Sequence, residues 1–471
     1  MKERTFKTIE EVIQVLNSYR GKAFIDIDKF GSLKNSNNKG ALGHIVEESI
    51  LGYKKNSDKN ADILVGDERY EIKLTPLKIN KNKTISAKER LSMDLIQFMK
   101  IPLENFEDSV FWNKAKKLII VYYFNEEGKD RSEFKIDRAF HYEYPEKDLE
   151  IIKNDWEFIR AKISSGNADL MSEGDTDYLG AMRKGQGGDK DLTEAPSKIS
   201  GETILANRRA FSLKQGYMTT VARKIFGEKI ESLNTNNISE YLNKKFAKYV
   251  NKTLEEIAND INFEIPKNPK NIKQLIMSKV LGISRSNLNS IEEFEKANIM
   301  AKTVTLSKGK KPPEQNMSFE FIDFEFWSNE DDNFYESYIY KFFEETKFLS
   351  LVFENVSDTK NQLKHIFVGF VIWNLPESEI ETKIKPVWEK VRYLINDVGH
   401  VTYGKNAKGP DSDKLPGTTF NHVFHIRPGG RDSNDLVELP TGQSIPKQKF
   451  WLDRKYIYQQ ILNSGILEEN Q

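Results

Sequence analysis

The chain has 471 residues, of which 38% are hydrophobic and 30% are charged, and its 71 basic side chains balance its 71 acidic ones. This composition is typical of a protein with two or three globular domains. The absence of cysteine excludes disulfides, zinc–thiolate sites and thiol catalysis, and no apolar run approaches the roughly 18 residues of a membrane span. Because the N-terminal residues contain no apolar signal core, we expect a cytoplasmic protein without membrane contact.

The first 80 residues predict two helices followed by a hairpin. Residues 8–20 predict a helix that is capped by Thr8. Residues 40–52, G-A-L-G-H-I-V-E-E-S-I-L-G, predict a short amphipathic helix that carries Glu47 and Glu48. The apolar side of this helix comprises Leu42, Ile45, Val46 and Ile50.

Residues 62–73, D-I-L-V-G-D-E-R-Y-E-I-K, combine a predicted hairpin with a chemically informative spacing. The two strands turn near Gly66, and Glu71 and Lys73 lie two residues apart, so both side chains leave the same face of the second strand. Asp62 lies on the other arm of the hairpin and can reach the same point. Two carboxylates beside one ammonium suit a Mg²⁺ ion and an attacking water. A helix carboxylate, Glu47 or Glu48, would complete such a site.

The remaining segments of the first half alternate between strands and helices. Because Gly, Pro and polar runs end regular elements, the boundaries follow from them. The predicted elements are a strand end running into a helix at 84–99, a buried strand at 117–124, a helix at 148–165, an irregular Gly-rich segment at 183–203, a strand and helix at 209–226, and a linker at 227–237.

The second half resembles a partial copy of the first. Three pairs of segments occur in corresponding order, which favours a duplicated domain. The pairs are 69–75 with 298–304, 178–188 with 425–431, and 209–217 with 448–456. In the second copy the lysine is kept as Lys302, whereas Met300 replaces Glu71 and Ile291 stands nine residues earlier in place of Asp62. The neighbouring Glu292 and Glu293 leave open a shifted carboxylate.

Together these segments resemble the MutH-like endonucleases. The resemblance rests on G-x-x-V-E and I-L-G-Y, on N-S-D-K-N-A-D, on Y-E-I-K-L-T-P-L-K, on S-A-K-E-R-L, and on A-F-S-L-K-Q-G-Y-M-T-T-V-A-R. It is strongest to the GATC-specific type II restriction enzymes with two MutH-like domains. It implies an α/β (α+β) PD-(D/E)xK nuclease fold, a mixed sheet flanked by helices, in two tandem domains at residues 1–230 (catalytic) and 231–471 (degenerate, DNA-binding or effector).

The resemblance also implies roles for individual residues. Asp62, Glu71, Lys73 and Glu47 would be catalytic, and the three carboxylates would bind Mg²⁺. Glu47 is favoured over Glu48 because it lies four residues after Gly43. Arginine and lysine can donate to guanine O6 and N7 in the major groove. The expected DNA-binding residues are Lys88, Arg183, Lys184, Ser212 and Lys214 in the first domain, and Arg427, Arg431, Arg454 and Lys455 in the second.

The sequence therefore predicts a Mg²⁺-dependent type II restriction endonuclease that cleaves double-stranded DNA at GATC. Its partners would be the DNA substrate and a second DNA site acting as an allosteric effector, and the protein would be a monomer able to dimerise on DNA. Two alternatives stay open at this point: a MutH-like nicking enzyme of DNA repair, and a DNA-binding protein that does not cleave. The neutral net charge excludes neither DNA-dependent function, because only the binding surface needs to be basic.

Overall fold

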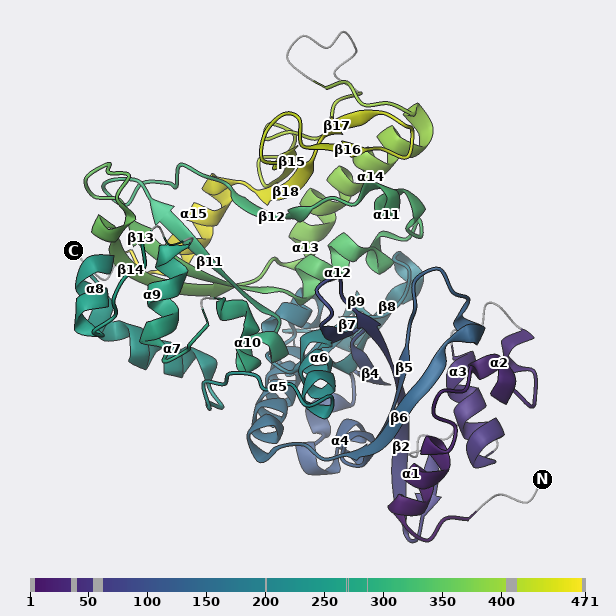
Figure 1. Cartoon of the computed structure of the whole chain (residues 1–471). Coiled ribbons are helices and arrows are strands. Elements are labelled where there is room, and N and C mark those ends of the chain that lie inside the picture. The colour runs from purple at the N-terminus through teal and green to yellow at the C-terminus, as the bar shows by residue number, and fades with distance from the viewer. Residues whose placement is uncertain are drawn as a thin grey trace. The chain divides into compact units, whose positions relative to one another are not determined.

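The computed structural model describes residues 5–34, 40–53, 62–199, 201–267, 269, 271–285, 287–403 and 413–467. The chain forms two compact units (Figure 1). The first unit comprises Met1–Lys184, Asp191–Asn236 and Glu292–Asn298, and the second comprises Gly185–Lys190, Asn237–Ile291 and Ile299–Gln471. This division differs from a single boundary at residue 230, because one short segment on each side of the boundary belongs to the other unit.

The main sheet of the first unit is built around the predicted hairpin. Strand β1 (Ile63–Val65) pairs antiparallel with β2 (Glu68–Ile79), and Gly66 turns the chain with a φ of +58°, a value that glycine adopts without strain. On its other side β2 pairs in parallel with β5 (Leu118–Phe124), which pairs antiparallel with β6 (Lys135–Tyr142). The short β3 (Ile85–Ala87) pairs with the far end of β2. The hairpin and the buried strand are thus confirmed.

Three helical segments from the N-terminal region pack against this sheet. They are α1 (Ile9–Asn17), α2 (Phe24–Ile27), and α3 (Ala41–His44) with its π-helical continuation η2 (Ile45–Leu51). Thr8 caps α1 as predicted, since its hydroxyl accepts a hydrogen bond from the Glu11 amide. The predicted apolar side of the 40–52 helix is confirmed, because its side chains Leu42, Ile45, Val46 and Ile50 are all buried in the same cluster as the sheet.

A second, three-stranded sheet completes the first unit. Its order is β4 (Leu91–Leu95), β10 (Arg209–Leu213) and β7 (Leu179–Arg183), all antiparallel. The helix expected within 84–99 was wrong: pairing with β10 makes this segment the edge strand β4, so tertiary contacts override the helical spacing. The remaining elements are α4 (Val110–Ala115), α5 (Glu146–Ser164), α6 (Gln215–Ile225), and the hairpin of β8 (Leu192–Pro196) and β9 (Thr203–Asn207), which occupies part of the segment expected to be irregular.

The second unit repeats three strands of the main sheet and the whole of the three-stranded sheet. Strand β11 (Ile299–Leu306) is parallel to β13 (Lys347–Glu354), which is antiparallel to β14 (Ile366–Trp373), as in β2, β5 and β6. Likewise β18 (Gln448–Leu452) lies between β12 (Met317–Phe321) and β15 (Phe424–Pro428), as β10 lies between β4 and β7. The three predicted sequence correspondences therefore fall on equivalent strands.

Two further correspondences appear only in the structure. N-F-E-D-S at 105–109 and N-F-Y-E-S at 333–337 each form a 3₁₀ turn before a helix capped by the serine, Ser109 for α4 and Ser337 for α12 (Tyr338–Glu345). L-S-M-D-L-I at 91–96 and M-S-F-E-F-I at 317–322 contain the edge strands β4 and β12. Such matched capping and strand signals indicate that one supersecondary plan was used twice.

The second unit contains further helices and strands, and its apolar core cluster is formed by residues from β11 onward. The further elements are α7 (Ile238–Phe246), α8 (Leu254–Asp260), α9 (Ile272–Val280), α11 (Phe324–Asn329), α13 (Glu377–Glu379), α14 (Lys385–Tyr393), α15 (Arg454–Asn463), β16 (Leu436–Glu438) and β17 (Ser444–Pro446). The helix α10 (Glu292–Lys296) belongs to the first unit. None of the helices in the described part of the chain has the length and apolar character to cross a bilayer.

Candidate active site

The hairpin brings Asp62 beside the strand that carries Glu71 and Lys73. One carboxylate oxygen of Asp62, Oδ2, accepts a hydrogen bond from the backbone amide of Ile72 at 2.8 Å. This bond ties the residue just before β1 to the middle of β2. Glu71 and Lys73 leave β2 on one face, as predicted, and their Oε1 and Nζ atoms are 2.7 Å apart. The structure therefore gathers the predicted Asp, Glu and Lys around one point of the sheet.

Glu47 approaches this point from the helical segment η2. The negative charges of Asp62 and Glu71 both raise its pKa, which places the three carboxylates within electrostatic range of one another. A Cβ at Gly43 would stand 4.0 Å from the Glu47 carboxylate, so the glycine four residues earlier leaves that side open. Single π-helical turns often occur at functional sites. Glu48 contributes only the smallest of the effects on Glu47, and the choice of Glu47 stays a prediction.

Burial and mutual repulsion make two of these carboxyl groups weak acids. Burial, Asp62 and Glu71 raise the pKa of Glu47 to about 7, against a partial opposing effect of Lys73. Burial and then Glu71 raise the pKa of Asp62 to about 6. A bound divalent cation would lower the pKa of both groups, since it favours the ionised form of every nearby carboxylate. The electrostatics thus fit a site that binds a cation.

The unused oxygen of Glu71 supports the same interpretation. Its Oε2 atom is buried and has no hydrogen-bond partner, although a buried carboxylate oxygen is normally satisfied. Oxygen-rich carboxylate sets are the preferred donors for Mg²⁺ and similar ions. Among the residues that the structure describes, no three His, Cys, Asp or Glu side chains are gathered closely enough to hold a metal as they stand. Lys73 and the Ile72 amide engage two of the six carboxylate oxygens instead.

Lys114 is a residue of this site that the sequence reasoning missed. It lies in the last turn of α4, and its positive charge lowers the pKa of Asp62. Its Nζ is also 3.7 Å from the Oδ1 of Asp94 on β4. A second cation beside the carboxylates can contact DNA phosphate. Nothing in the local pattern K-A-K-K singles out Lys114, because only tertiary packing turns this lysine toward Asp62.

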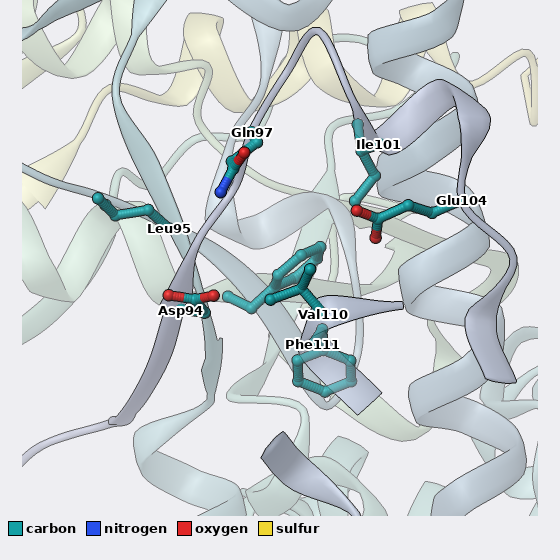
Figure 2. Close-up of a pocket in the computed structure, with 8 residues that line it drawn as sticks. Asp94, Leu95, Gln97, Ile101, Glu104, Val110 and Phe111 are labelled. Carbon is teal, nitrogen blue, oxygen red and sulfur yellow. The ribbon is translucent and has the colours of Figure 1, made fainter. Parts of the chain in front are cut away.

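A small pocket adjoins Asp94, as Figure 2 shows. Its lining is mostly apolar and comprises Asp94, Leu95, Gln97, Ile101, Glu104, Val110, Phe111 and Phe211. The space suffices for about one water molecule. It is therefore too small for a base or a nucleotide, and the candidate site is the carboxylate cluster rather than this pocket.

Three of the predicted DNA-binding residues of the first unit lie near its surface. Lys88 directly follows β3, is exposed, and its backbone amide donates to the Pro76 carbonyl of β2. Arg183 ends β7 and Lys184 follows it, both half-buried. The Lys184 ammonium donates to the Ser92 hydroxyl at 2.9 Å.

Two other predicted DNA-reading residues lie inside the fold. Lys214 has no exposed surface, and its ammonium donates to the Thr176 carbonyl. Ser212 is equally buried, and its hydroxyl donates to the Glu173 carboxylate at 3.3 Å. Glu173 also forms an ion pair with Arg90. In this structure both side chains are buried and bonded to the polypeptide, which differs from the exposed position expected of a base-reading residue. Their contact with DNA stays a prediction.

The predicted basic residues of the second unit are all exposed. The Arg427 guanidinium lies 5.6 Å from the ring centroid of Trp451 on the neighbouring strand, a cation–π arrangement. Arg431 faces Asp435 at 3.9 Å, and Arg454 donates to backbone carbonyls of the 313–314 segment. Lys455 lies in the first turn of α15. The strand register places Lys449 directly opposite Arg427, which adds a basic residue that the sequence reasoning missed.

In the part of the second unit that the structure describes, the positions equivalent to Asp62 and Glu71 are not acidic, but the residue that replaces Asp62 differs from the prediction. The Asn289 side chain accepts a hydrogen bond from the Ala301 amide at 2.7 Å, as Asp62 does from Ile72. Ala301 follows Met300, the counterpart of Glu71. Asn289, and not the fully buried Ile291, therefore stands in the position of Asp62. The amide oxygen of Asn289 carries no charge and the Met300 sulfur is a soft donor, so these positions bind Mg²⁺ less well than the two carboxylates that they replace.

The two adjacent glutamates are not shifted ligands either. Glu293 accepts hydrogen bonds from the Ser232 hydroxyl and from the amides of residues 233 and 234. Glu292 pairs with Lys224 and Lys296. Both side chains belong to the first unit and serve its packing.

Comparison with known proteins places this geometry in context. The family model of the DNA mismatch repair enzyme MutH matches residues 51–155, the region that contains Asp62, Glu71 and Lys73. The N-S-D-K-N-A-D motif begins in this region, and its residues 56–61 lie outside those that the structure describes. The chain is also 31% identical over 490 aligned positions to the type II restriction enzyme Sau3AI of Staphylococcus aureus. This similarity covers 94% of the chain and 96% of that enzyme.

Proposed function

Because the chain belongs to the family of MutH-like, Sau3AI-type restriction endonucleases and hydrolyses phosphodiester bonds of DNA, we propose that it cleaves double-stranded DNA at GATC with Mg²⁺ at the Asp62–Glu71 site. The observation that carries the proposal is the convergence of Asp62, Glu71, Lys73 and Glu47 on one face of β2, with a buried and unpartnered oxygen on Glu71.

The residues of this cluster divide the chemistry between them. Asp62 and Glu71 would hold the ion, and Glu47 would contact it directly or through water. The ion, when bound, supplies an acidified water and offsets charge on the phosphate. Lys73 would release its contact with Glu71 and orient the water for in-line attack. Lys114 would add a further positive charge near Asp62, available to a phosphate bound there.

The bases of the target site would be recognised by residues at the end of β7. Arg183 and Lys184 lie at this strand end and its following loop, and both carry donors that suit guanine O6 and N7. Each strand of GATC presents one guanine, so a small number of such donors suffices. Lys88 is exposed and suits a backbone phosphate better than a base, because no neighbouring side chain fixes its direction in the described residues.

For the second unit we propose a DNA-binding role without cleavage. Its strands repeat those of the catalytic unit, yet Asn289 and Met300 replace the two acidic ligands. At the same time the exposed Arg427 and the half-buried Lys449 and Trp451 form a basic and aromatic group on β15 and β18. A second DNA site bound here would act as an effector of the first unit, and the protein would be a monomer that dimerises on DNA.

The nicking alternative is weaker on one specific observation. The match to the mismatch repair enzyme covers residues 51–155, whereas the match to the restriction enzyme extends over both units. A single catalytic domain that awaits a partner would not need the second unit.

The test is cleavage of a short duplex with one central GATC, compared with duplexes that carry single-base changes. We expect cleavage of both strands only with GATC and only with Mg²⁺, with no product in a chelator. The matched variant Glu71→Gln removes one charged ligand at nearly constant volume and should bind the duplex without cutting it. Cleavage by this variant near the parent rate would reject the site, and cleavage of one strand alone would favour the nicking enzyme.

A further inference from the structure

A short segment from beyond the linker completes the catalytic unit. Residues Glu292–Asn298, which we call the strap, pack in the first unit although the 55 preceding residues, 237–291, belong to the second. The strap contains α10, and its last residue continues without interruption into β11 of the second unit. The strap is therefore joined directly to the first residue of β11 by one peptide bond.

The strap lies directly against the N-terminal turn of α6. The Gly216 amide donates to the side-chain oxygen of Asn298 at 3.0 Å. A Cβ at Gly216 would stand 1.9 Å from the Glu295 carbonyl, so only glycine permits this approach. Further along α6, the Thr220 hydroxyl donates to Glu295 at 2.8 Å, and Arg223 forms an ion pair with the same carboxylate. The fit is specific for the strap rather than a loose surface contact.

A buried ion pair fixes the strap to the rest of the catalytic unit. The Lys296 ammonium lies 2.7 Å from both carboxylate oxygens of Asp148 on α5, and the two side chains are only 4% and 8% exposed. The Tyr217 hydroxyl of α6 donates to the same carboxylate at 3.1 Å. Removing one partner from a buried pair leaves an uncompensated charge, so the strap cannot leave without a large penalty.

From α6 the contacts lead to the catalytic strand. The Thr219 hydroxyl accepts the Ala87 amide of β3 at 3.1 Å, and the Gln215 side chain donates to the Ala87 carbonyl. Ala87 in turn pairs with Leu77 of β2, the strand that carries Glu71. The strap, α6, β3 and β2 thus form a continuous series of hydrogen-bonded elements within the first unit.

We propose that the strap is the element through which DNA bound to the second unit changes the cleavage rate of the first. This inference rests on the effector role proposed above. Asn298 has a φ of +52°, a left-handed conformation, and joins the strap to β11. In this proposal a movement of β11 is transmitted to the strap through Asn298. Lys296 positions the strap through its ion pair with Asp148. The energetic link requires that the second-site DNA favour one of two strap positions.

The experiment separates the strap from β11 in the full-length protein without removing its contacts. A Gly-Ser-Gly tripeptide is inserted between Asn298 and Ile299. The control carries the same insertion after Gly128, in an exposed turn. A milder test is the substitution Asn298→Gly, which removes the hydrogen bond to Gly216. Its control is Asn262→Gly, because Asn262 is exposed and also has a left-handed backbone conformation. Cleavage of a one-site duplex is measured with and without an uncleavable GATC duplex in trans, together with the melting temperature.

We expect the parent and both controls to be stimulated by the second duplex, within the 5- to 150-fold range of typical couplings. The insertion at 298 should keep the unstimulated rate and melting temperature while its stimulation falls below about twofold, and Asn298→Gly should lose part of the stimulation. Undiminished stimulation of the insertion variant would overturn the role of the strap and leave the effector role intact. An unstimulated parent would reject the effector role itself, and the strap proposal with it.

Discussion

Replacing Glu47 with glutamine should stabilise the metal-free protein while it abolishes cleavage. Burial and two neighbouring carboxylates raise the pKa of Glu47 from 4.5 to about 7. Because the folded state holds this proton more tightly than the unfolded state, stability rises as the pH falls through 7. Above that pKa the ionised side chain destabilises the folded state by up to about 3 kcal/mol, at about 1.4 kcal/mol for each pKa unit. Below about pH 5 the cost falls to under about 1 kcal/mol.

The glutamine variant carries no such charge at any pH. In the presence of a chelator it should therefore unfold at a higher temperature than the parent at about pH 8, by roughly 6–12 °C for a unit of this size, and at nearly the same temperature at about pH 5. The assay is thermal unfolding of both proteins at the two pH values, followed by cleavage with Mg²⁺. A variant that melts below the parent at about pH 8 would refute the reasoning, because the carboxylate would then be part of a satisfied structural network. Retained cleavage would refute the assignment of Glu47 to the metal site.

Four further substitutions test individual residues. Asp62→Ala should lower the single-turnover cleavage rate by several orders of magnitude and leave binding to a GATC duplex intact, and a rate within tenfold of the parent would contradict its role as a ligand. Lys73→Arg should abolish cleavage, because a planar guanidinium cannot occupy the position of a compact ammonium, whereas near-parent activity would show that charge alone matters. Lys114→Met should raise the pKa of Asp62, so a pH–rate profile should show a larger loss at about pH 6 than at about pH 8, and a uniform loss would argue against this electrostatic role. Lys184→Ala should cost about 1–3 kcal/mol of discrimination at one base position in competition binding, whereas equal weakening for all sequences would indicate a phosphate contact.

The hairpin and the gathering of Asp62, Glu71 and Lys73 were predictable because they depend on local spacing. Glu71 and Lys73 share a face whenever their strand is extended, and Gly66 marks the turn. The amphipathic 40–52 segment was equally predictable from its apolar period. Its π-helical turn was not, since a single extra residue in a helix leaves no signature in composition.

The differences from expectation come from residues whose environment is set by distant parts of the chain. Lys214 looks like a surface lysine in F-S-L-K-Q-G-Y, but the segment around Thr176 covers it. Asp62 lies nine residues before Glu71, and the same count back from Met300 leads to Ile291. The residue that makes the equivalent hydrogen bond is Asn289, two positions earlier. The strap could not be predicted either, because nothing local in E-E-F-E-K-A-N indicates that Lys296 pairs with Asp148 in another part of the sequence.

The most direct test of the account is to map the ends produced by the purified protein on a long natural DNA. The protein is incubated with unmethylated phage DNA and Mg²⁺, and the ends of all fragments are sequenced. We predict that every double-strand cut falls at GATC, that a chelator prevents all cutting, and that Asp62→Ala produces no ends above background. Cuts at a different sequence would contradict the recognition proposal, and cuts that persist with chelator or with Asp62→Ala would contradict the metal site on which the account depends.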